Sequence, residues 1–476
     1  MISYKFEEDN KVKAQNMTED TPDNQEDPNY DIRNYNNTLI LLENSFKKND
    51  LVDIQQYLCK YWEKIQYYAT RLSIEELRIP QIVQLLMISL HNIIKDRDFN
   101  QFIVQKIFHT FNLIFYYTQT SNPYQFFTNS GIINILINIT GVAEDELFKE
   151  IIKFLRLLWD NTPDCLYFEY SVLNTSAFKR IVSDDNKYSP ETFLEYVYLV
   201  DQLSKYPNKE IQNCVDMIFT NAIFFIVIGN IEANEYGFRI INNLLNQNSP
   251  KIESLLTNSD ELSQSVTRLL DPLTDSKTLF QIIKSLGTMC MHQYDMRHFP
   301  LGGLIQFLTY NNDEIKIYTA FALCNALWSN KGHFTEEDCV KIILILSEVM
   351  STDKFTVISA ISCMIPKIFS VIPRNCYLNL VQKGFFDTLY RIASIDSFLK
   401  SEDGKNKDTV NDVQNFFNVI KNLFLFADES NLWGTFADAF EESGCYQILT
   451  ESEIDDPQIQ SIVDSFIYSY DKRKNE

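Results

Sequence analysis

The chain has 476 residues, of which 45% are hydrophobic and 13% aromatic, so it can bury a large core and is not disordered throughout. A single core stops growing near roughly 250 to 300 residues, so this length indicates several domains or an elongated fold that adds core linearly. Only 12 Gly and 13 Pro are present, which argues against an all-β chain and favours long helices with short connections.

The charge is strongly acidic, with 64 Asp and Glu against 42 Lys and Arg and a formal net charge of -22. Such a charge repels nucleic acid and anionic membranes and attracts cationic partners, or it serves solubility alone. The most apolar run, AIFFIVI at 222 to 228, is far shorter than the roughly 20 residues of a membrane span. Nine scattered cysteines without a Cys-x-x-Cys pair, and an N-terminus without an apolar signal stretch, indicate a reducing compartment.

In chain order, residues 1–35 are expected to form a disordered acidic tail, because they hold nine acidic and four basic residues and few aliphatics. The helical pattern of a repeat domain then runs over residues 36–470. It is interrupted at 401–412, where the sequence SEDGKNKDTVND predicts a solvated, disordered insertion. Residues 471–476 are expected to be a short C-terminal tail.

Two series of punctuating residues repeat along this domain. A glycine-bearing turn followed by an apolar helix occurs around Gly131, Gly303, Gly384 and Gly444, and prolines follow long apolar helices at Pro123, Pro163, Pro207 and Pro250. The proline intervals of 40, 44 and 43 residues match the period of α-solenoid repeats, each of which buries its apolar face only against its neighbours. We therefore expect an all-α, right-handed solenoid of nine or ten repeats. Two irregular helical bundles with coincidental spacing are the alternative.

The stretch 302–330, GGLIQFLTYNNDEIKIYTAFALCNALWSN, shows what one repeat could present to a partner. On a helix it places five residues on a buried face: Ile315, Thr319, Ala322, Leu323 and Ala326. Phe321, Asn325 and Trp328 form a separate stripe. An asparagine amide offers a donor and an acceptor to the backbone of an extended peptide, and aromatic walls hold aliphatic or cationic side chains.

Stepping one period at a time extends this stripe along the chain. The positions that correspond to Asn325 are Asn112, Arg156, Gln202, Asn243, Thr288, Cys363 and Asn422. One turn earlier stand Phe108, Ile152, Tyr198, Arg239, Lys284, Phe321, Ser359 and Asn418. Trp159 and Trp328 end long helices, where closure of the core between repeats is the simpler interpretation.

Our candidate peptide-binding residues are Asn112, Asn243, Asn325, Asn422, Phe108, Tyr198, Phe321, Trp159 and Trp328. If consecutive repeats stack in parallel, these side chains form a ladder that holds a peptide through its main chain. Chance is the alternative, because asparagine is abundant in this sequence.

Residues 302–330 and 122–165 resemble armadillo repeats, and in particular those of the importin-α family. The closing segment FEESGCYQILTESEIDDPQIQSIVDSFIYSY, 440–470, is similar to that family's final repeat. The resemblance implies a groove in which Trp-x-x-x-Asn pairs on the third helix of each repeat hold nuclear localisation signals. The asparagine binds the cargo backbone and the tryptophan binds the lysine stems.

Carried over to this chain, the resemblance matches Asn325 and Asn112 to the family's asparagine, with Phe321 and Phe108 where tryptophan is expected. Asn243 and Asn422 match the asparagine alone. The family opens with a strongly basic segment that binds importin-β, whereas residues 1–35 here are acidic. This departure speaks against importin-β as a partner.

No nucleotide-binding, hydrolase or zinc-protease motif occurs, so we expect no catalytic residues, no cofactor and no enzymatic activity. Cys290, His292, Asp295 and His298 lie close in sequence, but their spacing fits no standard zinc pattern, and no metal site is predicted.

The preferred function is an importin-α-like adaptor that holds a basic, extended peptide and is present in cytoplasm and nucleus. A general armadillo scaffold without a transport role is the first alternative. An enzyme subunit is the second.

Overall fold

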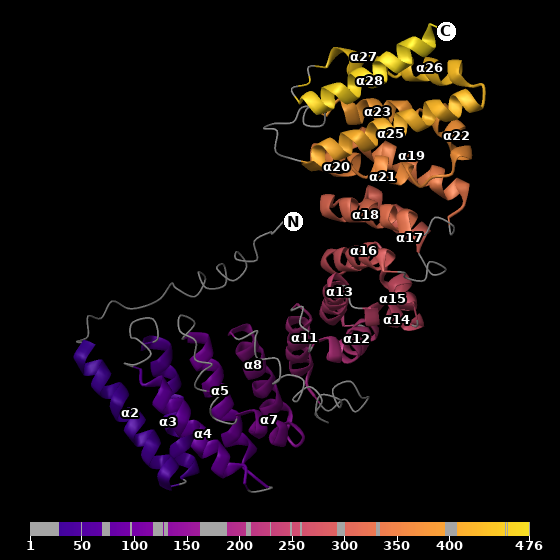
Figure 1. Ribbon diagram of the computed structural model, residues 1–476. Helices are drawn as coiled ribbons and strands as arrows, with labels where there is room; N and C mark the ends of the chain where they lie inside the picture. Colours follow the sequence, from indigo (N-terminus) through magenta and orange to yellow (C-terminus); the bar gives the residue numbers. More distant parts are fainter. Residues whose placement is uncertain are drawn as a thin grey trace. The chain divides into compact units, whose positions relative to one another are not determined.

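A computed structural model of the chain contains α-helices and short 3-10 helices over the residues that it describes (Figure 1). The described residues are 28–48, 50–68, 77–95, 98–117, 127, 132–161, 188–205, 211–228, 230–247, 250–257, 259–292, 300–329, 334–395, 407–452, 454 and 456–475. They divide into two compact units, Met1–Thr162 and Pro163–Glu476, each of which is described by itself. None of the helices in these ranges is long and apolar enough to cross a bilayer.

The first unit is a stack of helices whose core is largely aliphatic, with a cluster of phenylalanines beside α5 and α8. Its helices are α2 (Pro28–Lys48), α3 (Leu51–Tyr68), α4 (Ile79–Ile93), α5 (Gln101–Tyr117), α7 (Ile132–Thr140) and α8 (Asp145–Asn161). The long helices α3, α5 and α8 pack side by side in this order. Between α5 and α8, the rings of Phe108 and Phe154 lie 5.5 Å apart and those of Phe111 and Phe127 lie 5.0 Å apart.

The second unit continues the same plan with more helices. They are α11 (Pro190–Ser204), α12 (Ile211–Val227), α13 (Ile231–Asn246), α14 (Pro250–Thr257), α15 (Asp260–Leu269), α16 (Ser276–Met291), α17 (Leu301–Ile305), η2 (Gln306–Thr309), α18 (Asp313–Ser329), α19 (Glu336–Thr352), α20 (Phe355–Ser362), α21 (Ile365–Phe369), η3 (Arg374–Cys376), α22 (Tyr377–Gln382), α23 (Phe385–Ala393), α25 (Lys407–Glu429), α26 (Trp433–Glu442), α27 (Cys445–Glu451) and α28 (Pro457–Lys474).

Each long helix of the second unit packs against the next one. The order is α11, α13, α16, α18, the interrupted pair α20 and α21, then α25 and α28. With α3, α5 and α8 of the first unit, and with α20 and α21 taken as one, the two series have ten members in the described residues, a number in the expected range of nine or ten repeats. The helices α2, α4, α12 and α19 are of similar length and pack on members of these series. Both units are therefore all-α solenoids. The right-handed superhelix stays a prediction.

Three repeats show a full pattern of two short helices and one long helix. They are α14, α15 and α16; α22, α23 and α25; and α26, α27 and α28. Helical solenoid repeats of about 40 to 47 residues have two or three helices each. Gly384 (φ 83°) and Gly444 (φ 81°) occupy the left-handed region just before α23 and α27, where a residue with a Cβ is strained, so the predicted glycine turns are present there.

The other glycines and prolines of the two repeating series confirm the expected turns and helix ends only in part. Gly303 lies inside α17, so the glycine turn expected there is wrong, whereas Gly131 lies outside the described residues. Pro250 begins α14, where its missing N–H group costs no helical hydrogen bond. Pro123, Pro163 and Pro207 are outside the described residues.

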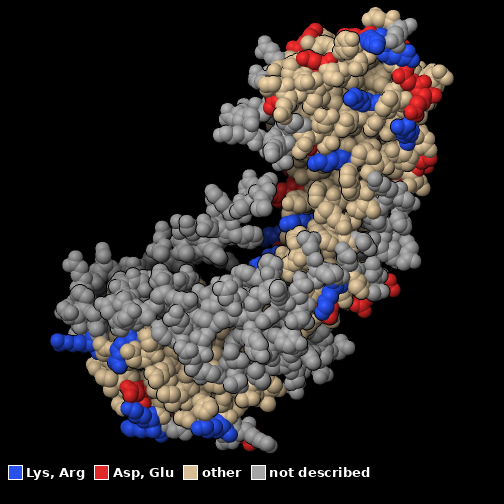
Figure 2. All heavy atoms as spheres, in the orientation of Figure 1, with Lys and Arg blue, Asp and Glu red and all other residues tan. Residues whose placement is uncertain are grey.

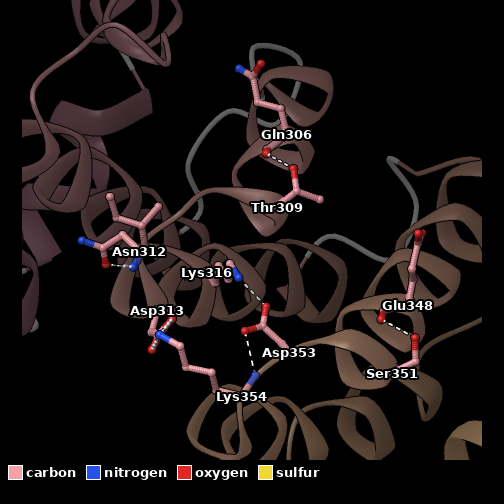
Figure 3. A network of polar contacts seen from close by, with 10 residues as sticks. Gln306, Thr309, Asn312, Asp313, Lys316, Glu348, Ser351, Asp353 and Lys354 are labelled. Atoms are coloured by element: carbon pink, nitrogen blue, oxygen red, sulfur yellow. Dashed lines mark hydrogen bonds and ion pairs between the residues drawn. The ribbon is translucent and has the colours of Figure 1, made fainter.

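Ion pairs link α18 to the turn between α19 and α20 (Figure 3). The Lys316 ammonium donates to the Asp353 carboxylate, and Lys354 Nζ lies 2.9 Å from Asp313 Oδ2. Burial alone would raise the pKa of Asp353, but the bond from Lys316 and the Lys354 backbone N–H lower it below its usual value. The side chains that form these bonds come from successive repeats, so they help to fix how the repeats stack.

The expected boundary at residue 35 is wrong, because α2 already begins at Pro28. Proline is well suited to the first turn of a helix, and the helix that follows has residues to bury. Tyr35 is fully buried, and its hydroxyl donates to the Leu77 carbonyl oxygen at 2.6 Å. Residues 1–27 lie outside the described residues, so the acidic tail itself stays a prediction.

Two further boundaries also differ from the expectation. Residues 407–412 of the expected insertion belong to α25, where Asp412 pairs with Lys367 of α21 at 3.6 Å. The expected C-terminal tail is helical as far as Lys474, because α28 ends in cations that find partners on other helices. Arg473 pairs with Asp428 at 3.1 Å, and Lys474 pairs with Glu441 at 2.5 Å.

Close approach of α12 and α13 depends on Gly237. A Cβ atom there would lie 2.6 Å from Ile226 Cγ1 and 2.8 Å from the Ala222 carbonyl oxygen. We expect Gly237→Ala to destabilise the chain by about 1–3 kcal/mol, because backbone must move, despite alanine's helix preference of about 1 kcal/mol. The shift of the urea unfolding midpoint, followed by circular dichroism, measures this effect.

The matched control is Gly434→Ala in α26, where nothing lies within 4 Å of the added Cβ. This substitution should leave stability unchanged or raise it by up to about 1 kcal/mol. Equal midpoints for the two variants would show that α12 and α13 do not require this close approach.

Candidate functional site

The helix α18 presents the stripe that its sequence predicts. Its five predicted core residues are all buried: Ile315, Thr319, Ala322, Leu323 and Ala326. Phe321 and Asn325 are partly exposed, and the Trp328 side chain is 53% exposed. Ring and amide groups therefore remain accessible on the side of α18 that does not face the core.

Two pairs of aromatic rings, which we together call the aromatic row, lie on four long helices of the second unit. The row consists of Tyr198 on α11, Tyr236 on α13, Phe280 on α16 and Tyr318 on α18, all partly exposed. The ring centroids of Tyr198 and Tyr236 lie 5.0 Å apart, and those of Phe280 and Tyr318 lie 4.9 Å apart, both in edge-to-face geometry. Stacked repeats thus bring together side chains that lie about 40 positions apart in the sequence.

The asparagines beside this row connect neighbouring repeats. Asn243 Nδ2 donates to Ser204 Oγ at 2.9 Å, and Asn325 Nδ2 donates to the Gly287 carbonyl oxygen at 2.9 Å. Both side chains remain partly exposed, as does that of Asn422 on α25. One amide proton of Asn243 and of Asn325 is thus used within the solenoid, whereas a primary amide has two protons and two acceptor positions in all.

In the first unit, two candidate residues do not form a binding surface. Phe108 is fully buried and packs against Phe111 and Phe154, because α8 and Phe127 cover this side of α5. It is a core residue, so the prediction that it lines a groove is wrong.

Asn112 is only 7% exposed, and its amide Nδ2 donates to the Glu150 carbonyl oxygen at 3.0 Å and to Glu150 Oε2 at 2.8 Å. The same carboxylate oxygen lies 3.2 Å from His109 Nδ1. Burial alone would raise the pKa of Glu150, but the contacts with His109 and Asn112 lower it below its usual value. Asn112 therefore connects α5 to α8 and is not available as a peptide ligand. The side chain of Trp159 lies outside the described residues.

A buried ion pair fixes α13 against α11. Arg239 binds the buried carboxylate of Asp201 through two bonds, Nε to Oδ1 at 2.7 Å and Nη2 to Oδ2 at 2.5 Å. The Arg239 guanidinium also lies 3.9 Å from the centroid of the Tyr236 ring. Removal of one partner of such a pair costs about 3–5 kcal/mol, because the other charge stays buried. Arg239 therefore lies over the ring of Tyr236, which belongs to the aromatic row.

Acidic side chains surround the first part of the row, and we call Glu195, Glu232, Glu235 and Asp275 the acidic patch. The Tyr198 hydroxyl donates to Glu232, and the pKa of Tyr198 is raised by burial, by this bond and by the negative charges of Glu232 and Glu195. Burial is the main cause that raises the pKa of Glu235. The cations Arg239 and Lys277 lower this pKa, and the carboxylates Asp275 and Glu232 raise it. A cation placed here would be stabilised.

The second part of the row carries a lysine. Lys284 of α16 is partly exposed, and its Nζ atom lies 5.8 Å from the ring centroids of both Phe280 and Tyr318. Gly287, one turn further along, allows α18 to approach α16, since a Cβ there would lie 3.1 Å from Phe321 Cδ1. The row is therefore acidic near α11 and α13 and basic at α16.

On the face drawn in Figure 2, Lys and Arg side chains lie among Asp and Glu side chains where the surface is described. The net charge of -22 thus does not appear as one continuous acidic surface on the described part of this face.

The described residues offer little support for catalysis. Among them, no group of three His, Cys, Asp or Glu side chains could hold a metal ion, and Asp295 and His298 are outside these residues. Burial raises the pKa of Cys290 to about 12 and that of Cys445 to about 12. Both thiols therefore remain protonated near neutral pH and are poor nucleophiles.

Sequence reasoning missed Tyr236, Phe280 and Tyr318 and found only Tyr198 of the row. These aromatic residues stand 38 or 44 positions apart, so a search for aromatic residues at the repeat period, in place of one for asparagine, would have found them. The ion pair of Arg239 with Asp201 gives no local signal, because its partners lie 38 positions apart on different helices.

The geometry defines a repeat scaffold with an exposed aromatic and polar strip on its long helices. No protein-family model and no curated protein matches the sequence. Among solved structures, the crystal structure of an engineered protein is similar with a TM-score of 0.60 and 14% identity, over 90% of this chain and 98% of that chain.

Two designed armadillo repeat proteins have a lower similarity. One has a TM-score of 0.40 and 16% identity over 52% of this chain and 99% of that chain. The other, in complex with the peptide (KR)4, has a TM-score of 0.40 and 17% identity over 52% of this chain and 98% of that chain. The likeness to the engineered protein concerns the fold, which is an all-α solenoid of stacked repeats.

Asn112→Ala tests whether this residue is structural. We expect a loss of about 1–3 kcal/mol at neutral pH, because the buried Glu150 carboxylate loses a donor. The folded pKa of Glu150 is lowered, so its contribution is present above the unfolded value of about 4.3 and is lost as the pH falls below it. The stability difference should therefore narrow below about pH 4, as measured by urea unfolding.

The control is Asn37→Ala on the exposed side of α2 in the same unit. It should change stability by less than about 0.5 kcal/mol. If Asn112→Ala is as mild as the control, the bonds to Glu150 do not hold α5 and α8 together.

Proposed function

We propose that the chain is a non-enzymatic binding scaffold that holds an extended segment of a partner protein along the aromatic row and the adjacent asparagines. The observation that carries this proposal is the row itself. These four partly exposed rings offer apolar surface to a partner's side chains, although the Arg239 guanidinium lies over the Tyr236 ring. Asn243 and Asn325 lie on two of these helices, α13 and α18, and Asn422 lies on α25; all three supply polar groups for a peptide main chain.

The partner segment is basic at the point where it crosses α11 and α13. The acidic patch supports this assignment, because its carboxylates act on Tyr198, Tyr236 and one another, and negative charges attract a cationic side chain. Lys or Arg stems also pack well on the exposed faces of aromatic rings. Charge attraction would speed association and make it dependent on salt.

The more specific form of the proposal is an importin-α-like adaptor that carries basic cargo between cytoplasm and nucleus. The sequence resemblance of residues 302–330 and 440–470 supports it, as does the placement of Phe321 and Asn325 on one exposed stripe. Phe108 and Asn112 of the first unit are buried, so the described candidate residues for binding this ligand lie in the second unit. We do not include importin-β among the partners.

A general scaffold whose row takes a different ligand is the second candidate. The stacking of Arg239 on Tyr236 at 3.9 Å favours it, because this ring is already covered by a cation of the protein. In an adaptor for localisation signals, such a surface would be left open for a lysine of the cargo.

Binding of a fluorescent peptide with clustered lysines separates the two candidates. The adaptor should bind it with an affinity that falls as salt is added, because partly exposed charges are screened. Fluorescence anisotropy at several salt concentrations measures this dependence. Absent or salt-independent binding would favour the general scaffold.

Glu235→Gln should weaken binding of this peptide by about two- to tenfold, because it removes one charge from the acidic patch and keeps the shape of the side chain. Glu337→Gln on the exposed surface of α19 is the matched control, since it removes the same charge elsewhere. Equal affinities for the two variants would place the cationic site away from α13.

A further inference from the structure

Some cations of the long helices are paired with carboxylates, and others, such as Lys106 and Lys284, contact aromatic rings. Arg239 is paired with Asp201, Lys316 with Asp353, and Lys367 with Asp412. The ammonium group of Lys284 has no ion pair or hydrogen bond with any residue that the structure describes. This ammonium group makes cation–π contacts with the rings of Phe280 and Tyr318.

The environment of Lys284 is poor at stabilising a cation. The side chain is partly buried, and burial is the cause that lowers the pKa of Lys284 below its ordinary value. Two rings whose centroids lie 5.8 Å away offer only a weak cation–π attraction. A carboxylate placed beside this ammonium group would restore the missing counter-charge and form a charge-assisted hydrogen bond.

We propose that Lys284 is a recognition site for a carboxylate of the partner, so that the bound segment carries an acidic residue next to its basic residues. This inference rests on the proposed function, because it assigns a second subsite on the same row. The ligand is then an extended peptide of mixed charge. Its cationic side chains lie at the acidic patch near α11 and α13, and its Asp or Glu side chain lies at α16.

The spacing of the two subsites follows from the helix packing. Along the packed helices α13 and α16, Lys284 lies at about the same height as Phe238. The reason is that the neighbouring Ser285 hydroxyl donates to the Phe238 carbonyl oxygen at 2.9 Å. Glu235 therefore lies about one helical turn, roughly 5 Å, from this level along α13. Packed helices are about 8–10 Å apart, and an extended chain rises about 3.3 Å per residue. The acidic residue is thus expected about three or four positions from the basic ones.

Labelled 12-residue peptides in a Gly/Ser host test this assignment with the full-length protein. Each has two lysines and, three or four positions away on either side, a Glu, Gln or Lys residue. In the best register the Glu peptide should bind about three- to tenfold more tightly than the Gln peptide at physiological salt. Fluorescence anisotropy gives the affinities.

Substitutions at position 284 show whether this preference comes from Lys284. In Lys284→Gln the Glu and Gln peptides should bind equally, and in Lys284→Glu the Lys peptide should become the tightest ligand. Lys383→Gln removes an exposed lysine between α22 and α23 and should keep the original preference. Circular dichroism checks that each variant is folded.

The possible failures are distinct from one another. If the lysine peptides bind but Glu gives no advantage, or if its advantage survives in Lys284→Gln, the carboxylate site is wrong and the proposed function stands. If none of the peptides binds, the carboxylate site and the basic-peptide function are both wrong.

Discussion

The structure depends on one constraint: a long helix of the solenoid has to pack against the long helices of both adjacent repeats. Most polar groups that are buried between such closely packed helices form hydrogen bonds. This explains why contacts recur between residues 38 to 47 positions apart, among them Arg239 with Asp201, Asn325 with Gly287 and Thr288 with Asn242. It also explains Gly287, where a Cβ would lie 3.2 Å from Ala322 Cα of α18.

The same constraint determines which side chains are left for a partner. A residue on the outer side of a long helix is exposed only where no neighbouring segment covers it. Phe321 on α18 meets this condition and Phe108 on α5 does not, although both precede an asparagine by four positions. Asn112 and Asn325 likewise both connect neighbouring helices, but only Asn325 remains partly exposed. Similar local sequences thus have different burial in the two units.

This difference indicates how far the sequence could predict the structure. The helical class, the repeat period and the buried face of α18 follow from spacing along one helix or from one repeat to the next, so the sequence contains them. The burial of Phe108 depends on Phe127 and α8, and the pairing of Arg239 depends on the offset between α11 and α13. Such offsets are set by packing in three dimensions. The boundaries at 35 and 412 were wrong for a related reason, because Tyr35 and Asp412 obtain partners only in the folded chain.

The unequal charge along the aromatic row has a consequence for orientation. Glu232 and Glu235 lie towards one end, and Lys284 lies towards the other. If the proposed segment of mixed charge lies across these helices, turning it end for end would bring like charges together. A scaffold of this kind distinguishes a sequence from its reverse. It can therefore fix which flank of a partner protein leaves from which side of the stack.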